Sequence, residues 1–180
     1  MVERELEFKL LGLNFNYYEK LLQNKGATLI AHEFQTNTVI DSTIFPLIDT
    51  DCYLRIREIK NLLDNSKKKE LTFKKKVNNE YARENLEYTI EFDNKKNLIK
   101  ILENLKLDKY IVGTKERTSY RYKNLRIDFD KWDKDTYPFP YIEVEASTNE
   151  ELYELLDELN ISKEHISLKS ITQLQNELRR

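Results

Sequence analysis

The sequence has 180 residues and a mass of 21.7 kDa, which predicts a single domain over residues 1–180. With 39% hydrophobic and 34% charged residues, the composition excludes a disordered chain. The 30 basic and 32 acidic residues leave a net charge of −2, too small a field to hold nucleic acid or anionic lipid. We therefore expect no nucleic-acid partner and no membrane partner.

The few glycine and cysteine residues exclude further kinds of site. The three glycines do not form the loops that usually cradle nucleotide phosphates, and Cys52 alone cannot make an internal disulfide or a cysteine zinc cluster. With only two histidines, a metal site would depend on hard oxygen ligands. No apolar run approaches the roughly 18 residues of a spanning helix, and the charged start at Glu3 is unlike a signal segment, so we expect a cytoplasmic protein.

Alternation of apolar and polar residues predicts strands, and helical spacing after capping residues predicts helices. In chain order we expect a strand over 2–10, a helix over 14–25, strands over 28–41, 53–60, 71–77 and 81–92, a helix over 94–105, strands over 109–123, 125–132 and 141–146, a helix over 149–159, and helix from 162 to the end. Several neighbouring strands look hairpin-connected. This order predicts an α+β fold, an antiparallel barrel of eight strands with helices packed outside.

Charged residues share one face of nearly every predicted strand. In the first strand Glu5, Glu7 and Lys9 lie opposite Leu6 and Phe8, because successive strand residues point to opposite faces. The corresponding face of the later strands carries Arg55, Arg57, Lys74, Lys76, Arg83, Glu87, Lys115, Arg117, Arg126, Asp128, Asp130, Glu143 and Glu145.

A single strand of this kind would belong to an ordinary sheet that is wet on one face. Across seven strands, however, the amphipathic helices need the apolar faces to cover, which leaves the charges on an open surface or in an interior. Charges collected in an interior are costly unless they pair or bind ions. We therefore predict a site for a polyanion with metal ions, in which basic side chains take phosphates and carboxylates take Mg²⁺ or Mn²⁺.

Short charged motifs follow one another along nearly the whole chain. They are Glu5-Leu6-Glu7-Phe8-Lys9, Leu54-Arg55-Ile56-Arg57, Thr72-Phe73-Lys74, Arg83 to Glu87, Lys115-Glu116-Arg117, Asp128-Phe129-Asp130 and Glu143-Val144-Glu145. The set and its order resemble the CYTH superfamily, the triphosphate tunnel metalloenzymes, with their class IV adenylate cyclase-like and thiamine triphosphatase-like members. One departure is Asn85, which stands where the family usually has the first glutamate of Arg-x-Glu-x-Glu.

The resemblance implies a closed, eight-stranded antiparallel tunnel that binds a triphosphate lengthwise. Lys9 would act near the reacting end, together with Glu5 and Glu7, and Glu87 and Arg126 would line the same interior. The implied metal ligands are Glu5, Glu7, Asp128, Asp130, Glu143 and Glu145. The implied phosphate contacts are Arg55, Arg57, Lys74, Lys76, Arg83, Lys115 and Arg117.

Three functions fit these residues. The first is metal-dependent hydrolysis of inorganic triphosphate or of a nucleoside or organic triphosphate. The second is a class IV adenylate cyclase that converts ATP to cyclic AMP and pyrophosphate. The third is a non-catalytic polyphosphate- or nucleotide-binding module, which is compatible with the neutral Asn85 in place of the family's glutamate. The sequence also leaves a homodimer as an alternative, because the apolar face of the strands could be larger than the area that the helices cover.

Overall fold

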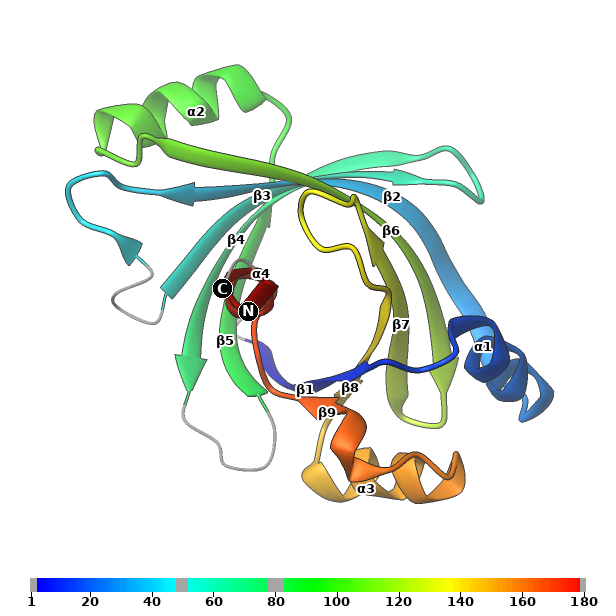
Figure 1. The fold of residues 1–180 in the computed structure, drawn as a ribbon. Helices are drawn as coiled ribbons and strands as arrows, with labels where there is room; N and C mark the ends of the chain where they lie inside the picture. Colours follow the sequence, from blue (N-terminus) through cyan, green and yellow to red (C-terminus); the bar gives the residue numbers. More distant parts are fainter. Residues whose placement is uncertain (1–2, 48–51, 78–82, 179–180) are drawn as a thin grey trace.

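The computed structural model describes the backbone of residues 3–47, 52–77 and 83–178, and their side chains except those of 3–5, 77, 83 and 84 (Figure 1). The elements in chain order are β1 Glu3–Leu11, α1 Phe15–Asn24, β2 Thr28–Asp41, β3 Cys52–Asn61, β4 Lys67–Val77, β5 Arg83–Glu91, α2 Lys95–Asn104, β6 Lys109–Tyr122, β7 Leu125–Trp132, β8 Tyr141–Ala146, α3 Asn149–Glu158, the 3-10 helix η2 Lys163–His165, β9 Ile166–Ser167 and α4 Ile171–Leu178.

The strands form one antiparallel sheet in the order β5-β4-β3-β2-β6-β7-β8-β1-β9, which curves around a common interior (Figure 1). The α+β class and the large antiparallel sheet are therefore confirmed. The closed barrel of eight strands is not confirmed, because the sheet has nine strands. Besides β8, β1 pairs with β5 along residues 3–7 and with β9 along Lys9 and Leu10.

The chain after Ser162 differs from the continuous helix that we expected. The Ser162 side chain accepts a hydrogen bond from the Glu164 backbone N–H and begins η2, after which β9 pairs with β1 before α4 starts. β9 has only two residues, too few to show the alternation that identifies a strand. The strand that we expected to begin at Leu71 begins at Lys67, because residues 67–69 pair with residues 58–60 of β3.

Local capping explains where the helices begin. The side chains of Asn14 and Asn94 accept hydrogen bonds from backbone N–H groups three residues on, at 3.1 Å and 3.0 Å. Thr148 and Glu151 form a reciprocal capping box at the start of α3. The sequence predicts a cap at Asn14, at Asp93 or Asn94, and at Thr148 or Asn149, and the observed caps are Asn14, Asn94 and Thr148. Within the described ranges, no helix has the length and apolarity needed to cross a membrane.

The apolar faces of the strands pack against α1, α2 and α3, outside the curved sheet, whereas Leu174 of α4 packs against Tyr141 and Trp132 on the inward face, unlike the outer position expected for every helix. The largest core joins strand residues such as Phe8, Ile127 and Val144 to Leu22 of α1 and Leu152 of α3, all at most 1% exposed. A second core places Leu102 of α2 against Ile40, Leu54 and Ile56. Burial of each such side chain contributes about 1.5–3 kcal/mol. Because side chains alternate along a strand, this packing turns the charged faces toward the interior.

Candidate functional site

The interior of the sheet is lined by buried polar and ionisable side chains. Those of β6 show the alternation directly, since Lys115, Arg117 and Ser119 are buried while Glu116 between them is exposed. The other described side chains of this interior that are buried are Glu7, Lys9, Gln35, Asn37, Arg55, Thr72, Asn85, Glu87, Asp128, Asp130 and Glu143. For the charged residues among these, the predicted inward face is therefore the observed one.

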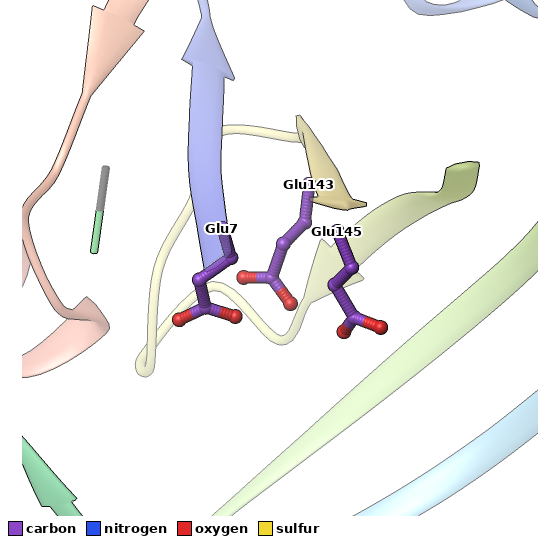
Figure 2. Close-up of side chains that lie close together, drawn as sticks. All are labelled: Glu7, Glu143 and Glu145. Carbon is purple, nitrogen blue, oxygen red and sulfur yellow. The ribbon is translucent and has the colours of Figure 1, made fainter. Parts of the chain in front are cut away.

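Three carboxylates from β1 and β8 lie together in this interior (Figure 2). One oxygen from each of Glu7, Glu143 and Glu145 lies within 4.8 Å of the others. The pairing of β1 with β8 brings them together, because Glu7 is opposite Glu145 and Lys9 is opposite Glu143. Carboxylate oxygens are the hard ligands that divalent cations such as Mg²⁺ prefer, so this donor set fits such an ion. The Lys9 ammonium lies beside them, 2.7 Å from Glu143 Oε2 and 4.0 Å from Glu7 Oε1.

Arg117 organises the acidic side of the interior. Its Nε and Nη2 donate to the two oxygens of Asp130, each at 2.6 Å, its Nη2 also donates to Glu143 Oε1 at 2.9 Å, and its Nη1 pairs with Asp128. Burial disfavours all these charges, yet the mutual attraction raises the pKa of Arg117 and lowers the pKa values of Asp130 and Glu143. The structure thus pairs Asp128 and Asp130, both expected as metal ligands, with Arg117, outside the group of three carboxylates.

Positive charge is in excess on the opposite side, at β3. Among the described residues, Arg55 and Arg57 have no carboxylate within the 4.0 Å of an ion pair. Burial, together with repulsion from Arg55 and Arg117, lowers the pKa of Arg57 to about 10. Burial and Arg117 likewise lower the pKa of Lys115 to about 7, although its Nζ lies 2.8 Å from Asp130 Oδ2. A bound anion would relieve this repulsion, so this side of the interior favours phosphate groups.

The remaining predicted residues occupy more varied positions. Lys74 forms an ion pair with Glu87 across β4 and β5, and Lys76 is exposed. Arg126 Nε lies 3.0 Å from Asp128 Oδ1 and 3.8 Å from Glu145 Oε2. The side chains of Glu5 and Arg83 lie outside the described residues, although their backbones belong to β1 and β5.

Asn85, the departure from the family pattern, points into the same interior. It is 1% exposed, and its Nδ2 donates to Glu7 Oε1 at 3.4 Å. It therefore occupies the place beside Glu7 where a further carboxylate would add an oxygen ligand. An amide at this position supplies a neutral donor to the carboxylate group instead.

Two contributions to the interior were missed in the sequence. The polar residues Glu33, Gln35 and Asn37 alternate along β2, a signal of the same kind as on the other strands, but only the β-prone apolar residues of that segment were used. Tyr141 is uncharged and is not among the site residues predicted from the sequence. Its ring lies 5.7 Å from Lys9 Nζ, its hydroxyl accepts a hydrogen bond from Trp132 Nε1 at 2.9 Å, and burial raises its pKa well above the ordinary value.

Comparisons with known proteins agree with this architecture. A family model described as CYTH domain matches residues 3–174. No curated protein sequence is significantly similar to this chain. Each solved structure below shares less than 25% identity with the chain, so these likenesses show the fold alone.

PH1819 from Pyrococcus horikoshii OT3 is similar with a TM-score of 0.80 at 22% identity, over 98% of this chain and 99% of that chain. A candidate adenylate cyclase from Vibrio parahaemolyticus is similar with a TM-score of 0.75 at 16% identity, over 97% and 98%. HpAC1 from Hippeastrum, a candidate adenylyl cyclase described as revealing a dominant triphosphatase activity, is similar with a TM-score of 0.69 at 16% identity, over 97% and 95%.

Proposed function

This chain belongs to the CYTH domain family, and on this premise we propose that it is a divalent-metal-dependent phosphohydrolase that acts on inorganic, nucleoside or organic triphosphates. The observation that supports the proposal is a single interior in which negative and positive side chains gather on opposite sides. Three carboxylates stand together on β1 and β8, and buried cations without enough carboxylate partners stand across from them on β3 and β6. The triphosphatase activity described for HpAC1 supports the choice of reaction.

We assign the roles by position. Glu7, Glu143 and Glu145, with Glu5 from the same strand as Glu7, would hold Mg²⁺ or Mn²⁺ inside the curved sheet, which we propose to work as a tunnel. Arg55, Arg57 and Lys115 would bind the phosphate oxygens. Lys74, Lys76, Arg83 and Arg117 stay predictions as further phosphate contacts, and Asp128 and Asp130 stay predictions as metal ligands.

The chain's own residues supply positioning and charge, which is most of what phosphoryl transfer requires. Lys9 is held by Glu143 and presents its ammonium beside the carboxylate group. The buried arginines bind the phosphates in a site with little water, where each charge–charge contact is stronger than in solvent. Bound metal would add neutralisation of the phosphate oxygens.

The test is turnover of inorganic triphosphate and of ATP by the purified chain with Mg²⁺ or Mn²⁺. Released phosphate is measured colorimetrically, and cyclic AMP is measured by chromatography on the same sample. Glu7→Gln should abolish metal-dependent turnover while the protein still folds. Glu116→Gln is the matched control, because Glu116 is exposed on the outer face of β6. Unchanged turnover in Glu7→Gln would contradict the ligand assignment.

The same assay separates the alternatives. Cyclic AMP as the main product would replace hydrolysis by the class IV adenylate cyclase reaction, in which ATP yields cyclic AMP and pyrophosphate. Tight binding of triphosphate without turnover in Mg²⁺, Mn²⁺ or Co²⁺ would identify a non-catalytic binding module. The neutral Asn85 beside Glu7 is the observation that keeps this last alternative in view.

A further inference from the structure

β2 contributes two uncharged amide side chains to the interior, which belong to none of the charged motifs. Gln35 is 0% exposed and Asn37 is 1% exposed. Leaving a buried polar group without a hydrogen bond costs about 1–3 kcal/mol, so such groups nearly always have a partner in folded proteins. The partners of these amides therefore indicate what the site binds.

The orientation of the Asn37 amide is set by Arg57. Arg57 Nε donates a hydrogen bond to Asn37 Oδ1 at 3.1 Å, and the two residues are opposite each other in the β2–β3 pairing. Arginine has donors only, so the oxygen of the amide must face it. The Nδ2 group consequently points elsewhere in the interior, and among the described residues it has no hydrogen-bond partner.

A second buried hydrogen-bond donor near Asn37, the Nε of Arg55, also has no partner among the described residues. Arg55 is opposite Val39, the next inward position of β2 after Asn37, so the register places it diagonally across from the amide. Such diagonal neighbours are within reach of long side chains. Asn37 Nδ2 and Arg55 Nε are therefore two buried donors without a partner beside Arg57, among the described residues. The Gln35 amide, in contrast, donates to Glu33 and leaves its Oε1 without a partner there.

We propose that Asn37 is a further substrate-binding residue, whose Nδ2 donates to an oxygen of the phosphoryl group that Arg55 and Arg57 bind in the proposed function. The proposal rests on the proposed function for the class of ligand. Asn37 Nδ2, Arg55 and Arg57 present only donors, and an ionised phosphoryl group brings only acceptors. Asn37 has two tasks here: its oxygen orients Arg57, and its nitrogen binds the substrate.

The binding role of Asn37 is tested by calorimetric titration of inorganic triphosphate into the full chain with a metal chelator present. Asn37→Ala removes the donor and should weaken the affinity about tenfold or more, the usual effect of losing a hydrogen bond to a charged group. The matched control is Thr38→Val. Thr38 is also buried on β2, at 4% exposed, but it faces away from the interior and should keep the wild-type affinity. Equal affinity of Asn37→Ala and the wild type would overturn the proposal.

A second measurement uses the unmodified chain and does not depend on a variant that folds. In protein labelled with ¹⁵N-asparagine, the Asn37 side-chain NH₂ resonance should shift on addition of inorganic triphosphate, because Nδ2 gains a partner. A purely structural role as the support of Arg57 would leave Nδ2 unbonded, so the absence of the downfield shift that a new hydrogen bond gives to the NH₂ protons would also overturn the proposal.

These outcomes are separate from those that test the proposed function. A chain that binds triphosphate through Asn37 but turns nothing over would keep the binding role of Asn37 and overturn the hydrolase. A chain that hydrolyses triphosphate with an unchanged Asn37→Ala affinity would keep the hydrolase and overturn the binding role of Asn37.

Discussion

Two arginines in the same interior have opposite surroundings, and this difference can be measured. Arg117 bonds to Asp128, Asp130 and Glu143, all of which are buried. Arg117→Met would leave these carboxylates without their main cation. Removal of one partner from a buried ion pair costs about 3–5 kcal/mol. For a chain of this length we expect a fall in melting temperature of about 6–20 °C.

Arg57→Met is the matched comparison. Within the described residues, Arg57 makes a single hydrogen bond, to Asn37, worth about 1 kcal/mol. Its charge is repelled by Arg55 and Arg117, and the substitution removes that repulsion. We therefore expect the stability of Arg57→Met to stay within about 1 kcal/mol of the wild type. Its affinity for triphosphate should nevertheless fall, because the variant lacks a half-buried cation that we propose binds phosphate.

Thermal and urea unfolding, followed by circular dichroism and by the fluorescence of the single tryptophan, Trp132, measure the melting temperature and the free energy of unfolding of both variants. Calorimetric titration of inorganic triphosphate then compares their binding. Equal destabilisation by Arg57→Met and Arg117→Met would refute the reasoning, because it would mean that the two guanidinium groups share the same pairing. Full affinity in a folded Arg57→Met would refute the division of the interior into an acidic and a phosphate side.

Two further predictions concern titration and metal binding. The pKa of Lys115 is about 7 in the folded protein and ordinarily 10.5, so the unfolded chain binds more protons between these values. The Lys115 contribution to the free energy of unfolding should rise with pH from about 7 to about 10, and urea titrations across this window should show a smaller rise in Lys115→Met. Asn85→Glu adds a carboxylate beside Glu7 and should tighten Mn²⁺ binding several-fold while making the metal-free protein less stable. Mn²⁺ calorimetry with an unchanged affinity would contradict the position assigned to Asn85.

The local pattern of the sequence was sufficient for most elements and for the inward face. Alternation along a strand is a property of neighbouring residues, so the buried Lys115 and Arg117 and the exposed Glu116 followed from their order alone. The caps at Asn14 and Thr148 are local in the same sense. The two-residue β9 is too short to show a pattern of its own, and it is a strand because its backbone pairs with β1.

Which charged side chains form ion pairs with one another could not be predicted from local sequence patterns. Asp128 and Asp130 have the same residue type and strand spacing as a metal-binding pair, but the register of β6 with β7 places Asp130 opposite Arg117. The Arg117 guanidinium consequently holds both of them together with Glu143, and neither belongs to the group formed by Glu7, Glu143 and Glu145. The role of Asn37 likewise depends on Arg57, which is twenty residues away and reaches it through the β2–β3 pairing.

The sequence by itself therefore determined which side chains face the interior, because that depends on the two-residue period of a strand. The tertiary structure decided which of them meet. Strand register and sheet curvature bring Glu7 to Glu143 and Glu145, and Arg117 to its three carboxylates. The reason is physical: the energy of a charge depends on the partners within a few ångströms, and those partners come from strands far apart in the chain.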